Sequence, residues 1–127
     1  CIEFFVLADD TLVANEMAPR PHNSGHYTIE GCVTSQYENH IRAILGLPLG
    51  STELIRPTVM KNIIGNVNKK AEVHGLEEAY KYPEVKIHIY GKEECRVGRK
   101  MGHITVTDKT IEDALFKARY AHSKIKF

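Results

Sequence analysis

Two glutamates near the start of the sequence, Glu3 and Glu16, are candidates for chemistry because the surrounding pattern predicts that they face each other. The runs CIEFFVLA and TLVANEMA are rich in strand-forming residues and flank Asp9–Asp10, which is typical of a hairpin. A turn centred between the aspartates pairs Glu3 with Glu16 and Phe5 with Ala14. Like charges directly opposite on a sheet are destabilising unless water or a cation screens them.

The glutamate pair is open to three interpretations. In the first interpretation, the two glutamates are exposed on a solvated face of the sheet and have no function beyond solubility. A divalent-cation site is the second interpretation, because Mg²⁺ takes hard oxygen ligands, keeps waters or substrate phosphates and needs only one or two carboxylates. Asn15 can add an amide oxygen to such a site if the strand is bulged there. An acid–base carboxylate pair is the third, although nothing in the sequence indicates a sugar substrate.

The segment NEMAPRPHNSGH, residues 15–26, is too polar for a core strand and too often interrupted by proline and glycine for a helix. It is either an ordinary surface turn, as segments rich in Pro, Asn, Ser and Gly often are, or the floor of a site. The second interpretation depends on Arg20, whose planar guanidinium matches bicarbonate, carboxylate or phosphate. His22, Asn23 and Ser24 are further donors and acceptors on the same loop.

The histidines of this loop raise the question of zinc. His22 and His26 have the spacing that places two side chains on one helix face, but Pro21 and Gly25 interrupt the helix that would aim them. A third candidate, His40, does not have a spacing typical of zinc sites. The sequence therefore disfavours zinc.

A second candidate site is the basic segment GKEECRVGRK, residues 91–100. Lys92 and Arg99 lie in it together with Arg96 and Lys100, and two glycines allow the backbone to approach a ligand. A solvated basic turn and a phosphate clamp both fit this composition. The glycine spacing matches neither a Walker loop nor a dinucleotide-binding fingerprint.

Composition narrows the class of protein. The 127 residues are about the size of one domain, with 43% hydrophobic and 26% charged residues, as in soluble globular proteins. A net charge of +1 argues against a dedicated nucleic-acid binder or a polybasic membrane module. No apolar run is long enough to cross a bilayer, and no signal peptide is visible. Three widely spaced cysteines favour a reducing compartment, with Cys32 and Cys95 packed as small apolar groups.

The remaining pattern predicts a mixed order of strands and helices, which indicates an α+β fold. A helix begins at Ser35, where Ser35 and Glu38 form a capping box, and it presents one apolar face. Strands are expected at 53–65, bent or moved to an edge by Pro57, and at 85–92 and 100–108, with a short helix or turn within 69–82. Thr110 opens a last helix, whose expected core residues are Ile111, Ala114, Leu115, Ala118 and Ile125.

Three stretches together resemble one enzyme family: residues 15–50 with the motif APRPHNSGH, MKNIIG at 60–65, and GKEECRVGRKMGHITV at 91–106. The sequence resembles the C-terminal part of the ATP-grasp N5-carboxyaminoimidazole ribonucleotide synthetases. In fungi this enzyme is the first portion of a bifunctional phosphoribosylaminoimidazole carboxylase of purine biosynthesis. The resemblance covers essentially the whole chain and comes in the same order.

The resemblance implies a reaction and roles for residues. ATP phosphorylates bicarbonate, and the carboxyl group passes to the exocyclic amine of 5-aminoimidazole ribonucleotide. Glu3 and Glu16 then resemble the Mg²⁺ ligands, with Asn15 beside Glu16 at the ATP-binding site. The catalytic residues Arg20, His22 and Asn23 resemble those that line the bicarbonate and aminoimidazole site. Lys92 and Arg99 resemble the pair that holds the 5′-phosphate.

The resemblance also implies an architecture. Residues 1–50 correspond to the C-terminal end of an ATP-grasp domain, an antiparallel hairpin plus helices. Residues 51–127 correspond to a small β-rich domain with a terminal helix and a rudimentary single-hybrid motif. Because the first run is strand-like from residue 1 and the lysines that hold ATP phosphates are not in the sequence, we expect a piece of a longer polypeptide that is inactive alone.

Further expectations follow from the family: a cytoplasmic enzyme, a homodimer when intact, and a fused or separate carboxylase (mutase) partner, without nucleic-acid or membrane binding. Two rival interpretations stay open. Another ATP-grasp carboxy-ligase, such as a biotin carboxylase relative, also fits the glutamate pair, although RPHNSGHYT and GRKMGH favour the aminoimidazole enzyme. A non-catalytic binding or dimerisation module is the other.

Overall fold

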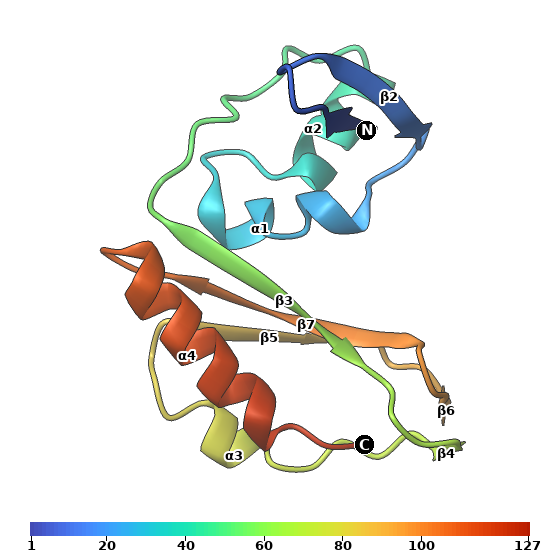
Figure 1. Cartoon of the computed structure of the whole chain (residues 1–127), viewed down its shortest axis with the longest axis vertical. Coiled ribbons are helices and arrows are strands. Elements are labelled where there is room, and N and C mark those ends of the chain that lie inside the picture. The colour runs from blue at the N-terminus through green and yellow to red at the C-terminus, as the bar shows by residue number, and fades with distance from the viewer.

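The computed structural model describes all 127 residues and has two parts joined by an extended segment (Figure 1). The N-terminal part holds β1 (Ile2–Val6), β2 (Leu12–Met17), the 3₁₀ turn η1 (Asn23–Gly25), α1 (Thr28–Gly31) and α2 (Gln36–Ile44). The C-terminal part holds β3 (Thr58–Ile64), β4 (Lys69–Lys70), α3 (Leu76–Ala79), β5 (Val85–Ile89), β6 (Glu94–Cys95), β7 (Lys100–Thr107) and α4 (Ile111–Lys124). The predicted mixture of helices and strands is confirmed.

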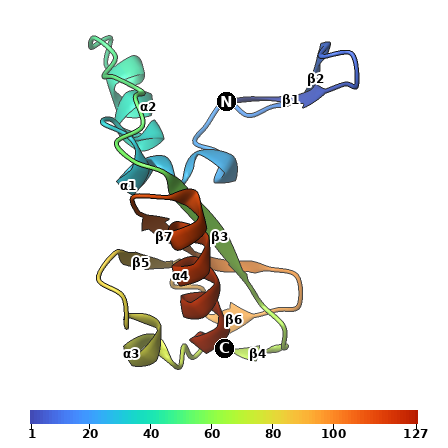
Figure 2. The same ribbon diagram turned by 60° about the vertical axis from the view of Figure 1, so that its left-hand side comes forward.

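The hairpin of β1 and β2 projects away from the rest of the chain (Figure 2). Glu3 pairs with Glu16 as predicted, but Phe5 pairs with Val13, so its predicted pairing with Ala14 is wrong. The register shifts between Glu3 and Phe4, because the second strand carries one extra residue there and forms a β-bulge.

The C-terminal part is built on an antiparallel sheet in the order β3-β7-β5, and α4 covers one of its faces (Figure 1). Side chains alternate between the two faces of a strand, and the face toward α4 is apolar. Its buried residues include Ile63, Val85, Ile104 and Val106. Pro57 immediately precedes β3, which is an edge strand as expected from that proline.

Helix α4 begins where the sequence predicts, but the face that it buries against the sheet is narrower than predicted. Thr110 accepts a hydrogen bond from the Asp113 N–H as N-cap. Ala114, Ala118 and Ala121 are fully buried, and Ile125 just beyond the helix is buried too. The predicted burial of Ile111 and Leu115 is wrong, since they are 47% and 37% exposed. They flank the alanine stripe, whose small side chains let the helix approach the sheet closely.

The opposite face of the sheet is polar and meets the N-terminal part. His103 on β7 lies between Asn62 on β3 and His88 on β5 in the same register. Helix α1 packs near β7, and Glu30 of α1 forms an ion pair with His88 (Nε2 to Oε1 2.7 Å). We call this contact between the two parts the seam.

Among the smaller elements, α2 and α3 are helical as predicted, whereas the two-residue strands β4 and β6 are not predicted by the sequence. Ser35 caps α2 by accepting the Glu38 N–H, although the Glu38 carboxylate binds Arg42 instead of completing the capping box. Cys32 and Cys95 are free and buried, as predicted. None of the helices has the length and apolar character that crossing a membrane requires.

Candidate functional site

The hairpin and the loop after it bring together two carboxylates and an imidazole. One ligand atom from each of Glu3, Glu16 and His22 lies within 4.8 Å of the others. The His22 Nε2 is 2.9 Å from Glu16 Oε1, and the Asn15 amide donates to Glu3 Oε1 at 2.6 Å. The sequence predicted the two glutamates and Asn15, but it did not predict that His22 joins them.

The β-bulge is the reason that this cluster forms. In a regular strand Asn15 and Glu16 would point to opposite faces. The extra residue places both of them against Glu3, since Glu16 is its strand partner and Asn15 is its hydrogen-bond donor. Two carboxylates and an uncommitted amide oxygen are hard oxygen donors, and this donor set fits Mg²⁺ better than zinc.

The loop that carries His22 is held by one side chain of α2. Gln36 accepts the His22 N–H through Oε1 at 2.9 Å and donates to the His22 carbonyl through Nε2 at 2.8 Å. The His22 Nδ1 lies 2.8 Å from the Ser24 hydroxyl, which leaves Nε2 directed at Glu16. A Cβ on Gly25 would meet Gln36 Oε1 at 2.4 Å, so only glycine fits there without moving Gln36.

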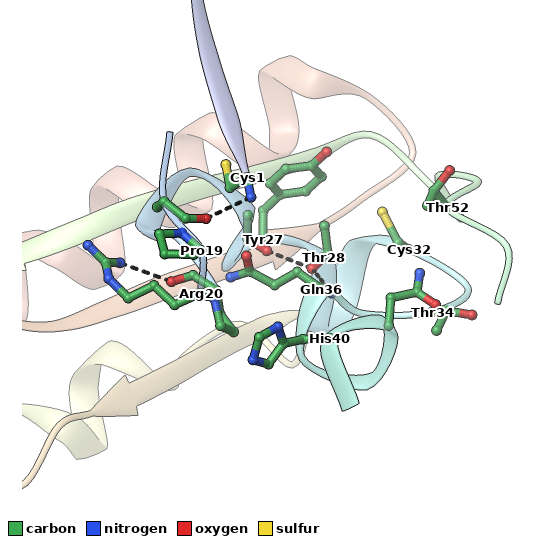
Figure 3. Close-up of a pocket in the computed structure, with 14 residues that line it drawn as sticks. Cys1, Pro19, Arg20, Tyr27, Thr28, Cys32, Thr34, Gln36, His40 and Thr52 are labelled. Atoms are coloured by element: carbon green, nitrogen blue, oxygen red, sulfur yellow. Dashed lines mark hydrogen bonds between the residues drawn. The ribbon is translucent and has the colours of Figure 1, made fainter. Parts of the chain in front are cut away.

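The three residues predicted to be catalytic do not all face one space. Arg20 lines an open cavity of about 640 Å³ beside α1 and α2, and its Nη1 donates to the Pro21 carbonyl at 3.1 Å (Figure 3). His40, weighed only for zinc in the sequence, lines the same cavity. His22 instead faces the carboxylates, and the Asn23 carbonyl accepts the His26 N–H at the end of η1.

Lys92 and Arg99 are brought together by the glycine-bearing turn between β5 and β7. Both line a small surface cavity of about 350 Å³. Lys92 Nζ donates to the Lys100 carbonyl at 2.6 Å, and Arg99 Nη1 donates to the Glu94 carbonyl at 3.1 Å. The pKa of Lys92 is lowered, first by partial burial and then by the charge of Arg99. Glu93 and Glu94 line the same cavity, and the Glu94 carboxylate is paired with Arg96 at 2.6 Å. Two neighbouring cations, Lys92 and Arg99, suit a phosphate dianion.

Comparison with known proteins places the chain in a family. The model of the phosphoribosylaminoimidazole carboxylase C-terminal domain matches residues 58–117, and that of the ATP-grasp domain matches residues 1–37. The N5-carboxyaminoimidazole ribonucleotide synthase of Bacillus subtilis is 53% identical over 104 residues, which are 82% of this chain and 26% of that protein. The crystal structure of the Thermotoga maritima synthetase matches with a TM-score of 0.89 at 54% identity, over 98% of this chain and 35% of that one.

The chain belongs to the N5-carboxyaminoimidazole ribonucleotide synthetase family. A further relative is the Aspergillus clavatus synthase in complex with ADP and 5-aminoimidazole ribonucleotide, at 43% identity and a TM-score of 0.80 over 96% of this chain and 33% of that one. The chain spans about a quarter of the length of the curated bacterial synthases it matches. The family is ATP-dependent, and the ADP and ATP complexes of its members agree with the expected nucleotide.

This member of the synthetase family also has a group of polar residues whose meeting the sequence does not predict, although it marks one of them, His26, as a candidate for zinc. They lie at the seam and include His26, Glu30, His88, Tyr90 and His103. A signal for two of them was present in the strand pattern. His88 and His103 occupy positions that point away from the apolar face of β5 and β7, which is the pattern of a polar contact surface.

Proposed function

We propose that this chain supplies three components of an N5-carboxyaminoimidazole ribonucleotide synthetase: the metal carboxylates, the loop at the small substrates and the clamp for the ribonucleotide phosphate. The observation that carries the proposal is the joint presence of the Glu3–Glu16–His22 cluster and the converging Lys92 and Arg99 in one chain of this family. The relative with ADP and 5-aminoimidazole ribonucleotide supports both ligands.

The carboxylate cluster is the proposed binding place of Mg²⁺ with the nucleotide. When bound, the ion neutralises phosphate charge during phosphoryl transfer to bicarbonate. Glu3 and Glu16 offer carboxylate oxygens, and Asn15 holds the Glu3 carboxylate by its amide N–H. The His22 Nε2–H donates a hydrogen bond to the Glu16 carboxylate, so this histidine orients one of the proposed metal ligands.

The loop and the turn bind the remaining substrates in this proposal. The Arg20 guanidinium faces an open cavity and can present two parallel N–H groups to a planar anion such as bicarbonate. The Lys92 ammonium and the Arg99 guanidinium hold the 5′-phosphate of the ribonucleotide, and Asn23 lies on the loop beside His22. Binding at both ends directs the aminoimidazole amine toward the activated carboxyl group.

The whole enzyme needs further parts. We propose that residues 1–50 complete an ATP-grasp domain and that residues 51–127 form the small C-terminal domain with its rudimentary single-hybrid motif. The matched ranges of the two family models support this division. The other ATP-binding residues then come from the rest of a longer chain, in a cytoplasmic homodimer that acts with a carboxylase (mutase) domain.

The test uses a chimera in which residues 1–127 replace the matching segment of the Thermotoga maritima synthetase, called the chimeric synthetase below. Glu16→Gln removes one charge from the proposed metal site, so we expect turnover to fall about 100- to 1000-fold, equivalent to about 2.7–4 kcal/mol in the barrier. Folding should be unharmed, because Glu16 is 56% exposed. Steady-state kinetics at several Mg²⁺ concentrations measure the loss.

The matched control is Glu53→Gln, which changes an exposed carboxylate in the segment between α2 and β3. It should leave turnover within about twofold. The 127-residue chain alone is the blank and should hydrolyse no ATP in response to 5-aminoimidazole ribonucleotide. Near-normal activity of Glu16→Gln at ordinary Mg²⁺ would show that Glu16 is not a metal ligand. A chimera whose ATP hydrolysis does not increase with 5-aminoimidazole ribonucleotide would refute the proposed function.

A further inference from the structure

Three histidines from separate elements form a stack across the seam. The rings of His88 on β5 and His103 on β7 lie 4.4 Å apart at an interplanar angle of 13°. The ring of His26, which follows η1, lies 5.1 Å from His103 at 32°. His103 is in the middle and is only 2% exposed. Strands β5 and β7 are neighbours in the sheet (Figure 1), and the third ring, His26, comes from the other part of the chain.

One end of the stack reaches the substrate loop, residues 19–26. Gln36 Nε2, which holds the His22 carbonyl, also lies 2.8 Å from His26 Nδ1. The Tyr37 hydroxyl lies 2.9 Å from the same nitrogen. A movement of the His26 ring therefore displaces Gln36, and Gln36 fixes both backbone polar groups of His22.

The other end reaches the phosphate clamp, Lys92 and Arg99. The Tyr90 hydroxyl lies 2.8 Å from His103 Nδ1, and Tyr90 is two residues before Lys92. The Tyr90 N–H donates to the Met101 carbonyl at 3.0 Å, and the Lys92 ammonium lies 5.9 Å from the centre of the Tyr90 ring. The position of His103 thus sets the position of the residue that begins the clamp turn.

Hydrogen-bond chemistry favours uncharged rings at two of the three histidines, His26 and His103. The His22 backbone fixes which end of the Gln36 amide is Nε2, and that nitrogen can only donate. His26 Nδ1 must then accept, so its proton is on Nε2 and the ring is neutral. When the single proton of a neutral His103 is on Nδ1 and is donated to the Tyr90 hydroxyl, the buried and unpartnered Nε2 carries no hydrogen, whereas a charged His103 would place an unsatisfied N–H there.

We propose that His103 is a positioning residue, whose neutral ring holds the substrate loop and the phosphate clamp at the separation that the ribonucleotide requires. The inference rests on the proposed function, because it names what the two connected segments bind. His103 touches neither the metal cluster nor the clamp cations by any hydrogen bond of its own. It acts through His26 and Gln36 on one side and through Tyr90 on the other.

The charges around the stack agree with this role. Burial first, and then the neighbouring His88 and His26, lower the pKa of His103 from 6.5 to about 4. Burial also lowers the pKa of His26, with further contributions from Lys100, His22 and His88. The carboxylate of the assembly is Glu30, which pairs with the outer ring, His88, away from His26. Tyr37 and Tyr90 complete it, each with its pKa raised by burial.

The kinetic test compares two substitutions of His103 in the chimeric synthetase. His103→Leu removes the ring and its bond to Tyr90, and we expect KM for the ribonucleotide to rise about tenfold or more and by a larger factor than KM for ATP, because both connected segments bind the ribonucleotide. His103→Asn places an amide where Nδ1 lies and should recover most of that loss. Rescue by asparagine separates a positioning role from simple filling of the core, which leucine satisfies better.

Two further variants keep the test decisive. Tyr90→Phe keeps the ring but removes its hydroxyl, so it should raise KM for the ribonucleotide in the same direction even if His103→Leu does not fold. His74→Gln removes an exposed imidazole whose residue contacts Lys126 only through the backbone, and it should change nothing. If the parent chimera uses the ribonucleotide but His103→Leu, His103→Asn and Tyr90→Phe all behave like His74→Gln, the positioning role is refuted while the proposed function stands.

A measurement on the 127-residue chain is independent of the reaction. Ring ¹⁵N shifts should show His103 uncharged at pH 6, whereas histidine in an unfolded peptide titrates near pH 6.5, and should place the proton of the neutral His26 ring on Nε2. Acidification should shift the backbone amides of Gly25 and Lys92 together as His103 becomes charged, and His103→Asn should abolish that shared response. A charged His103 at pH 6, or amides of Gly25 and Lys92 that respond separately, would overturn the inference.

Discussion

The two parts of the chain differ in how they bury their apolar residues. In the C-terminal part, α4 and the three-stranded sheet enclose a core with Ile104, Val106 and the alanines of α4 fully buried. In the N-terminal part, every residue of β2 is exposed, and the large apolar residues of β1 are too. The apolar face predicted for α2 is also open, with Ile41 and Ile44 54% and 66% exposed.

The difference teaches which part can be stable by itself. A sheet with a helix on one face forms its own core, whereas a two-stranded hairpin is marginal in water without further packing. The match of residues 1–37 to the ATP-grasp model fits an apolar hairpin that packs against more of that domain in a longer chain. The Glu3–Glu16–His22 cluster thus lies on the less stable part, and the seam connects that part to the more stable one.

The largest effect is expected from truncating a core residue of the C-terminal part, compared with the same kind of change on the hairpin. Ile104→Ala removes a fully buried side chain, so the free energy of unfolding of the chain should fall by about 2–5 kcal/mol. Phe5→Ala, at a site that is 55% exposed on the hairpin, should cost less than about 0.5 kcal/mol. Urea denaturation measures both. Equal losses would mean that the hairpin packs in this chain and that the two parts do not differ.

A smaller effect is expected at the clamp, on the well-packed part. Arg99→Ala in the chimeric synthetase should raise KM for the ribonucleotide about 10- to 150-fold, the value of one charge-assisted bond of roughly 1.5–3 kcal/mol. KM for ATP should change little. Arg99→Lys should restore only part of the loss, because an ammonium lacks the planar two-pronged contact.

The neighbouring Arg96 is the control for the clamp, because it is exposed and bound to Glu94. Arg96→Ala should leave both constants within about twofold. If Arg99→Ala weakens the binding of ATP and leaves the binding of the ribonucleotide unchanged, the clamp holds ATP and the proposed ligand is wrong.

Acid should weaken the seam before it weakens the ion pairs of the C-terminal core. Unfolded His103 takes up a proton near pH 6.5 and folded His103 only near pH 4, so lowering the pH through that range favours the unfolded state. The loss is about 2 kcal/mol between pH 6.5 and pH 5, at about 1.4 kcal/mol per unit. Lys117 lowers the pKa of Asp108 and Glu84, so their contribution is lost only below the ordinary carboxylate range. Urea denaturation at pH 7 and pH 5 measures the difference.

His103→Asn is the control for the pH dependence. It should remove the share of the loss due to His103, and the remaining decrease reflects the lowered pKa values of His26 and His122. A wild-type chain whose stability is the same at pH 7 and pH 5 would show that folded His103 is protonated at pH 5.

Local sequence signals predicted the elements of both parts, because caps and alternation act over a few residues. Ser35 and Thr110 begin their helices as expected, and Glu3 faces Glu16. The register beyond Glu3 was not predictable from a symmetric turn. It depends on a three-residue loop in which Asp10 has a φ of 63°, and on a bulge that compensates for it.

The sites were predictable to the extent that their residues are close in sequence or match a family motif. Lys92 and Arg99 share one turn, and the structure brings them together. The contact of His22 with Glu16 depends on Gln36, fourteen residues further along, and the contact of His26 with His103 depends on how the two parts meet. Contacts of that kind come from tertiary packing and have no local sequence signal.

The smallest effects are expected from the loss of helix caps, and comparing a cap in each part tests whether the two parts unfold together. The hydroxyls of Ser35 and Thr110 each accept a backbone N–H at 3.1 Å, so replacing either by alanine removes the same kind of cap, worth about 1 kcal/mol. Thr110→Ala should lower the free energy of unfolding measured at the main transition by about 1 kcal/mol, because α4 is part of the core. Ser35→Ala should change it by less than half as much and should instead speed amide exchange within Gln36–Glu38, because α2 can open locally. Equal shifts in urea denaturation would mean that the seam couples the parts into one cooperative unit. The histidine stack would then stabilise the N-terminal part as well as position it.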